Sequence, residues 1–185
     1  RLLLGVASGD RPMEYPLFGV DYDQRGALFR SAVELLKTQG AGRLPQGAEL
    51  LPQREEAFPL LVAGLGQQSP NWIGEHMGGW LAYPGTAQEH QRRVRLWREV
   101  GGDKPYITFL HLDLEADPHA PLKALRFGGR GGRYALIDEL QALREAGVQH
   151  VGLHLRHSGR PILSVMEELA EYVLPMFHGA ADCQG

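Results

Sequence analysis

The chain has 185 residues, a formal net charge of −3 and one cysteine, Cys183. Its length is that of one domain with a good hydrophobic core, and the weak charge without a basic or acidic block argues against nucleic-acid or membrane-surface binding. The lone cysteine excludes an intrachain disulfide and favours a reducing, cytoplasmic location, and no apolar run has the length of a membrane-spanning helix.

The first third of the chain predicts one strand and one helix. Residues 2–7 form an apolar run that reads as a strand, and it begins directly after Arg1. We therefore expect the chain to be a piece of a longer protein. The loop up to residue 23 carries Tyr15 and Phe18 between prolines, which makes it too broken for a helix and too aromatic for a solvated linker. Residues 23–38 predict an amphipathic helix, and residues 41–58 a long surface excursion.

A strand, a glycine turn and a helix follow. The apolar run at residues 60–63 predicts a buried strand, and Ser69 followed by Pro70 is typical of a helix start. The helix start and its dipole favour an anion, to which Gln67, Gln68 and Ser69 can donate, while Gly66 allows close approach. On spacing alone, a turn capped only for stability explains the same residues equally well.

The rest of the chain repeats the strand–helix pattern. A capping box at Thr86 and Glu89 opens a helix that ends near residue 101, and residues 106–114 predict a strand with His111 and Asp113 on one face. A loop at 117–133, a helix from 134, a strand at 148–155 and a helix at 161–177 follow, with a frayed tail at 179–185. Five strand–helix rounds predict a parallel sheet, either open and doubly wound or the later part of a barrel.

Three collinear blocks then narrow the choice. They are LGVASGDRPMEYPLFGVDYDQRGALFRSAVELL, LLVAGLGQQSPNWIGEHMGGWLAYP and FGGRGGRYALIDELQALREAGVQHVGLHLR. Together they resemble the bacterial luciferase-like flavin-dependent monooxygenases, and most of all the luciferase-type oxidoreductases. The resemblance implies a parallel (β/α)8 TIM barrel in which residues 1–185 are a single domain containing strands four to eight with their helices.

The resemblance also implies a cofactor site. In the family, the turn after the fifth strand and a basic residue of the preceding helix hold the flavin phosphate. The matching residues of this chain are Gly66, Gln67, Gln68 and Ser69, with Arg25 as the basic partner. At the end of the first strand the chain has Ser8 where luciferase has an arginine, so no phosphate contact is assigned to Ser8.

An enzyme of this family would use reduced FMN, supplied by a flavin reductase, and O2 to oxidise a small organic substrate. Deazaflavin is the alternative cofactor. The sequence predicts His111 as the catalytic residue and Tyr15, Phe18, Tyr83 and Arg156 as the substrate pocket. Trp80 is assigned to core packing. We also expect copies of the chain to associate into a homo-oligomer, because an open parallel sheet edge favours pairing.

Two alternatives stay open at this point. One is a barrel hydrolase that holds a metal ion through His111, Asp113 and His154. The other is an inactive barrel fragment that associates through its open sheet edge. The sequence does not identify the oxidised substrate or choose between FMN and deazaflavin.

Overall fold

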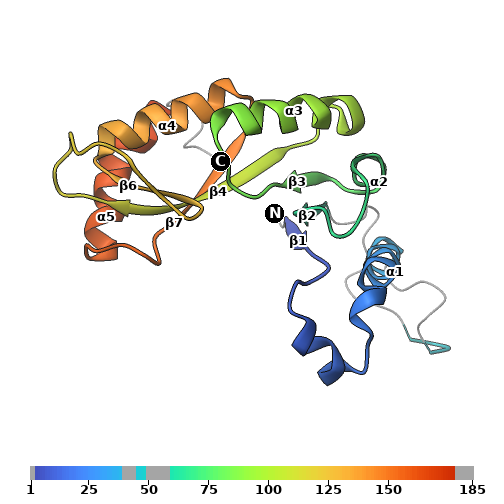
Figure 1. Cartoon of the computed structure of the whole chain (residues 1–185). Coiled ribbons are helices and arrows are strands. Elements are labelled where there is room, and N and C mark those ends of the chain that lie inside the picture. The colour runs from blue at the N-terminus through green and yellow to red at the C-terminus, as the bar shows by residue number, and fades with distance from the viewer. Residues whose placement is uncertain (1–2, 39–44, 49–58, 178–185) are drawn as a thin grey trace. The chain divides into compact units, whose positions relative to one another are not determined.

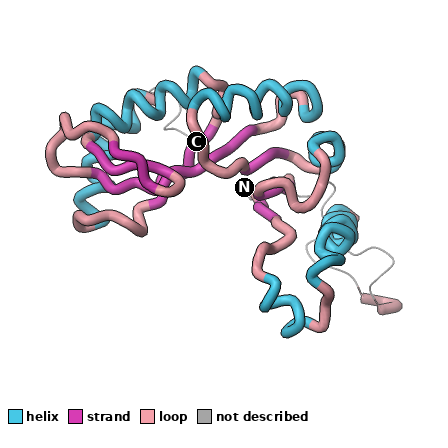
Figure 2. The backbone as a smooth tube through the Cα atoms, viewed as in Figure 1, coloured by secondary structure: helices cyan, strands magenta, loops and turns pink. Residues whose placement is uncertain are grey.

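The chain forms two compact units in a computed structural model that describes residues 3–38, 45–48 and 59–177. The first unit comprises residues 1–81 and 96–105, and the second comprises residues 82–95 and 106–185. Strands and helices alternate along both (Figure 1, Figure 2). The predicted tail at 179–185 and most of the predicted excursion at 41–58 lie outside the described residues.

The first unit is built on three parallel strands, β1 (Leu4–Val6), β2 (Leu60–Ala63) and β3 (Gly79–Leu81). β2 lies between β1 and β3. Two short 3-10 helices, η1 (Pro12–Phe18) and η2 (Tyr22–Gln24), lead into α1 (Arg25–Lys37), and α2 (Pro70–His76) connects β2 to β3. β2 is apolar on both faces because it is the central strand.

The core of the first unit lies between this sheet and its helices. Phe29 and Val33 of α1 are buried, as is Ile73 of α2. α2 also crosses the end of α3 (Ala87–Gly101) at Gly74, where a Cβ would stand 2.1 Å from the carbonyl oxygen of Val100. Only glycine permits so close a crossing.

The second unit contains β4 (Tyr106–Leu114), β5 (Lys123–Leu125), β6 (Gly128–Gly131) and β7 (His150–His154). The Tyr106 carbonyl accepts from the amide of Gln149, whereas the His111 amide donates to the carbonyl of Phe127. Backbone groups of even and odd residues in a strand point to opposite edges, so β7 and β6 flank β4 on opposite sides. β5 then pairs with β6 in the antiparallel direction.

The helices of the second unit cover one face of β4. Side chains at even positions of β4 are buried and those at odd positions are half-buried, as the predicted alternation requires. α4 (Arg133–Glu145) buries Leu136, Leu140 and Leu143. After α5 (Ile162–Glu168) the helix continues as a π turn, η3 (Leu169–Val173), and a 3-10 turn, η4 (Leu174–Met176).

The five predicted strand–helix rounds are confirmed: β1–α1, β2–α2, β3–α3, β4–α4 and β7–α5. Three details of the prediction are wrong. The stretch at 117–133 contains the β5–β6 hairpin, which an apolar pattern misses because β6 is mostly glycine. The stretch at 10–23 contains η1, whose 3-10 turn tolerates Pro16. The last helix changes its hydrogen-bond pattern before Pro175, which has no amide proton to donate.

No helix among the described residues combines the length and the apolar character that a bilayer crossing requires.

Candidate functional site

The predicted phosphate turn lies in the first unit, between β2 and α2, and we call residues 64–69 the glycine turn. Three of its residues have left-handed backbone conformations: Gly64 at φ 65°, Gly66 at φ 55° and Gln67 at φ 61°. Glycine adopts this conformation freely, but for Gln67 it is unusual. A non-glycine residue held this way is a reason to ask what its side chain does.

The Gln67 side chain meets Arg25, which lies far from it in the sequence. Arg25 Nη2 donates to Gln67 Oε1 at 3.3 Å, and Arg25 Nη1 donates to the carbonyl of Tyr22 at 3.0 Å. The guanidinium carbon also lies 3.9 Å from the centroid of the Tyr22 ring. The structure therefore brings together Arg25 and Gln67, two residues that the sequence assigned to one phosphate site.

Gln68 has a different role, because every hydrogen-bonding group of its side chain is already used. It is buried, its Nε2 donates to the carbonyls of Gly26 and Gly66 at 2.9 Å each, and its Oε1 accepts from Arg30 Nε. Gln68 thus ties the glycine turn to the start of α1. The side chain supports the turn and offers no donor to a ligand.

Ser69 caps α2, as predicted. Its Oγ accepts from the amide of Trp72 at 3.3 Å, and Pro70 occupies the first helical turn. Accepting this bond leaves the hydroxyl proton of Ser69 available. Within the described residues, neither that hydroxyl nor the Nε2 amide of Gln67 donates to another group. Both side chains are exposed, so these donors are accessible to a ligand.

Two predicted pocket residues also lie in the first unit. The Tyr15 hydroxyl donates to the carbonyl of Ser8 just after β1, and the Tyr15 ring makes an edge-on contact with Tyr22 at 5.0 Å. Phe18, in contrast, is 78% exposed at the end of η1. Tyr15 is therefore linked through Tyr22 to Arg25, while the Phe18 ring makes no ring contact with another aromatic residue in the described part of the chain.

The other predicted residues lie in the second unit, around three imidazoles. We call His111, His154 and His157 the histidine cluster. The His111 ring centroid lies 4.9 Å from that of His154 and 5.1 Å from that of His157. Two of the three are brought together by strand pairing, because His111 of β4 lies opposite His154 of β7. The sequence placed these residues on separate strands but did not give their register.

An aromatic group borders the histidine cluster. Phe109 lies 5.6 Å from His111, and Phe127 lies 5.9 Å from His111, between ring centroids. Tyr83 contacts the same two phenylalanines at 6.4 and 6.1 Å and is 55% exposed. Tyr83 and His111, both predicted site residues, therefore belong to one continuous set of rings.

Burial and neighbouring groups disfavour the protonated form of His111. Burial lowers the pKa of the His111 imidazole below its ordinary value, and the nearby His154, His157 and Arg156 lower it further. A hydrogen bond to the backbone of Arg126 opposes this shift. The predicted pocket residue Arg156 is thus close enough to influence His111, and its amide donates to Nδ1 of His154 at 3.2 Å.

The proposed metal ligands are not arranged around a common point. Asp113 Oδ1 accepts from the amide of Gly159 at 2.8 Å, and its Oδ2 lies 3.5 Å from Arg130 Nε. Across the described part of the chain, no three His, Cys, Asp or Glu side chains are grouped in a way that could hold a metal ion. The hydrolase alternative therefore has no metal site among the residues that the structure describes.

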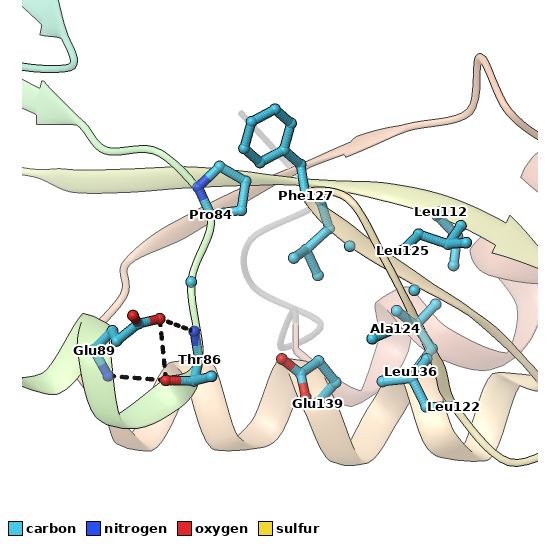
Figure 3. Close-up of a pocket in the computed structure, with 14 residues that line it drawn as sticks. Pro84, Thr86, Glu89, Leu112, Leu122, Ala124, Leu125, Phe127, Leu136 and Glu139 are labelled. Atoms are coloured by element: carbon cyan, nitrogen blue, oxygen red, sulfur yellow. Dashed lines mark hydrogen bonds between the residues drawn. The ribbon is translucent and has the colours of Figure 1, made fainter.

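A cavity that the sequence did not predict lies in the second unit (Figure 3). It measures about 380 Å³ and lies between the start of α3, α4 and the β5–β6 hairpin. Its walls are mainly apolar, including Leu110, Leu112 and Leu136, and Glu89 and Glu139 are its carboxylates. Leu110 and Leu112 belong to the helix-covered face of β4, so this cavity is separate from the face that carries His111. The sequence did not indicate this cavity, because hydrophobic periodicity predicts that such residues belong to the core.

Comparison with known proteins supports the fold. An F420-dependent secondary alcohol dehydrogenase in complex with an F420–acetone adduct superimposes with a TM-score of 0.64 at 16% identity, covering 87% of this chain and 66% of that one. The coenzyme F420-dependent tetrahydromethanopterin reductase from Methanopyrus kandleri gives a TM-score of 0.64 at 12% identity, covering 95% and 74%. The chain thus spans about two thirds of the length of the first of these enzymes.

Likeness at this level of identity shows the fold, and it confirms the predicted parallel α/β architecture of the luciferase-like barrel type. No curated protein sequence matches the chain. The sequence model of one family, described as luciferase-like monooxygenase, matches residues 1–111, which include the glycine turn and His111. Since this match covers more than half of the 185 residues, the chain belongs to the luciferase-like monooxygenase family.

Proposed function

We propose that the protein is a flavin- or deazaflavin-dependent oxidoreductase whose cofactor phosphate binds at the glycine turn. The observation that carries the proposal is the hydrogen bond from Arg25 to Gln67 at 3.3 Å, beside donors of Gln67 and Ser69 that are exposed and bond no other described residue. Family membership over residues 1–111 supports it, because that match contains all of these residues. A guanidinium and two neutral donors suit a phosphate monoester or diester.

The residues present fit such a group. Arg25 supplies positive charge and remains half-exposed, while the Tyr22 carbonyl and ring fix its guanidinium. Gln68 fixes the conformation of the glycine turn through its bonds to Gly26 and Gly66, so the donors of Gln67 and Ser69 are ordered before the ligand binds. Each charge-assisted hydrogen bond to the phosphate would contribute about 1.5–3 kcal/mol. A bound flavin or deazaflavin would supply the redox chemistry, and the protein would bind and orient it.

We further propose the monooxygenase form of this activity, with reduced FMN and O2 acting on a small organic substrate and a flavin reductase as partner. Membership in the luciferase-like monooxygenase family supports this choice. The F420-dependent enzymes of the same fold favour deazaflavin as the second candidate cofactor. Oxygen uptake by the protein with reduced FMN, compared with hydride transfer to or from F420, decides between them.

The cofactor site is tested by titrating FMN, riboflavin and F420 into the protein and following ligand fluorescence. We expect FMN or F420 to bind and Arg25→Ala to weaken that binding by about 10- to 100-fold, since one charge-assisted contact is lost. Riboflavin has no phosphate, so its affinity should not change in the Arg25→Ala variant.

Arg95→Ala is the matched control, because Arg95 is an exposed arginine on α3. It removes the same charge and should leave FMN affinity unchanged. The proposal is wrong if neither FMN nor F420 binds to the protein. It is also wrong if Arg25→Ala and Arg95→Ala weaken binding equally.

A further inference from the structure

A shallow hollow lies on the face of the second unit that carries the histidine cluster. It measures about 430 Å³ and is lined by Phe109 of β4, by Gly152, Leu153 and His154 of β7, and by Leu155 just after β7. Phe109 pairs with Gly152 and His111 pairs with His154 across these two strands. Because paired residues of adjacent strands share a face, the hollow has an apolar floor and an imidazole end.

Gly152 is the reason for the hollow. A Cβ at this position would have Phe109 Cβ as its nearest heavy-atom neighbour, at 3.7 Å, which is ordinary contact. Nothing in the backbone therefore requires glycine here, and its φ is not in the left-handed region. The missing side chain leaves the Phe109 ring uncovered beside it. A flat apolar ligand is the shape that fits such a space, since aromatic rings prefer offset or edge-on packing.

The polar end of the hollow offers hydrogen-bond donors. His154 Nδ1 accepts from the Arg156 amide, so a neutral His154 ring carries its proton on Nε2 and can donate it. His157 and the exposed guanidinium of Arg156 lie close enough to depress the pKa of His111. Asp113 is the nearby carboxylate, and its two oxygens are already engaged by the Gly159 amide and by Arg130.

Arg130 also forms an ion pair at 2.6 Å with Glu115, which directly follows β4, so the carboxylates of Asp113 and Glu115 both have partners. The Arg126 backbone accepts from the His111 ring, and Phe127 of the same hairpin is uncharged. Arg156, whose charge acts on His111, forms no ion pair with a carboxylate among the described residues. An anion placed there would be attracted by its guanidinium and could accept hydrogen bonds from the imidazole N–H groups.

We propose that the hollow binds a small planar apolar acid, with its ring over Phe109 and Gly152 and its carboxylate at the histidine cluster. The binding step depends only on residues of the second unit. Naming this ligand as the substrate class rests on the proposed oxidoreductase function. The substrate of the enzyme is then an aromatic or similarly flat carboxylate.

The test is calorimetric titration of the protein, without flavin, with three probes: benzoate, its neutral isostere benzamide, and inorganic phosphate. Benzoate should bind at least tenfold more tightly than benzamide, because only benzoate carries the charge that the cluster attracts. Phosphate should bind weakly, because it makes no contact with Phe109.

Four variants locate the site. His111→Gln and His154→Gln should each weaken benzoate binding about tenfold or more, because each removes one imidazole from the cluster. Gly152→Val should abolish binding by filling the hollow, and valine suits a strand position where its Cβ has room. His150→Gln is the matched control: His150 is an exposed histidine at the other end of the same strand, and the change should have no effect.

Three results would overturn the proposal. Equal affinity for benzoate and benzamide would show that charge is not recognised. Phosphate binding that depends on His111 and His154, without benzoate binding, would make this a phosphate site. If His111→Gln weakened FMN binding as much as is expected for Arg25→Ala, the hollow would belong to the cofactor site. FMN binding itself is measured separately, so failure here leaves the proposed function intact.

Discussion

Gly66 of the glycine turn and Phe29 of α1 lie so close together that a Cβ on the glycine would stand 2.8 Å from Cε1 of the phenylalanine ring. Gly66 also has φ 55°, a conformation that strains any other residue. Gly66→Ala therefore adds backbone strain and overpacking together. We expect it to lower the free energy of unfolding by about 2–4 kcal/mol, measured by urea denaturation.

Gly19→Ala separates the two contributions. Gly19 has φ 65°, but a Cβ there would meet no atom within 4 Å. Gly19→Ala should lower the free energy of unfolding by the backbone strain alone, about 1 kcal/mol. If Gly66→Ala costs no more than Gly19→Ala, the contact with Phe29 is not close packing.

The start of α3 provides a second test of local stability. Thr86 and Glu89 form a reciprocal capping box: the Glu89 amide donates to Thr86 Oγ1 at 3.2 Å, and the Thr86 amide donates to Glu89 Oε2 at 2.7 Å (Figure 3). Thr86→Ala removes one of these bonds and should cost about 1 kcal/mol in thermal or urea unfolding.

Ser164→Ala is the control for the cap, because the Ser164 hydroxyl bonds the carbonyl of Pro161 and is exposed. Removing this hydroxyl should change the free energy of unfolding by no more than about 0.5 kcal/mol. A Thr86→Ala protein as stable as Ser164→Ala would show that the cap contributes nothing to the folded state.

The sequence predicted most of the fold because local chemistry dictates it. Ser69–Pro70 and Thr86–Glu89 are capping signals that act within a few residues, and both caps occur as predicted. The sequence did not predict β6, because a strand made mostly of glycine shows neither strand propensity nor hydrophobic alternation. Gly128 pairs so closely that a Cβ would stand 2.0 Å from the His111 carbonyl, a constraint that comes from the partner strand.

The site was predictable as a set of residues but not as a set of contacts. Arg25 and Gln67 were assigned together through the family resemblance, and the structure brings them within 3.3 Å. Gln68 looked equivalent to Gln67, yet the backbone turns its side chain inward to Gly26. The neighbours of His111 depend on strand register, and the hydrophobic pattern of each strand fixes which face is buried but does not by itself name the partner residue on a strand joined through a helix.

An ion-pair network in the second unit gives a third prediction. Glu168 accepts from Arg133 at 3.0 Å and from Arg160 at 2.7 Å, and its side chain is 12% exposed. Burial tends to raise the pKa of the Glu168 carboxyl, but the hydrogen bonds from the two arginines outweigh it and hold the pKa below its ordinary value. Glu168→Gln leaves two guanidinium groups without their anion and should cost about 2 kcal/mol at pH 7.

Glu167→Gln is the neighbouring control, because Glu167 is exposed and the change should be close to neutral. The cost of Glu168→Gln should begin to shrink as the pH falls below the ordinary carboxyl pKa, where the unfolded chain takes up a proton. It should disappear below the lowered pKa of the folded state, where Glu168 itself is protonated. A cost that does not depend on pH would mean that the charge of Glu168 is not what stabilises the network.

The last prediction concerns His90, which is fully buried on α3 and makes a 2.9 Å hydrogen bond through Nδ1 to the hydroxyl of the equally buried Tyr106. Its Nε2 has no hydrogen-bond partner among the described residues. Burial lowers the pKa of His90 to about 4, and the charge of Arg93 acts in the same direction. The folded state therefore holds a neutral ring, whereas the unfolded chain takes up a proton near the ordinary histidine pKa of about 6.5.

The stability that depends on the neutral ring is fully present above that value and is lost as the pH falls toward 4. Up to about 3 kcal/mol should disappear over this window, measured as urea-unfolding free energies at successive pH values. In His90→Gln the side chain does not titrate, so the slope between pH 6.5 and 4 should flatten by this amount. An unchanged slope in the variant would show that His90 is not the group that makes the fold acid-sensitive.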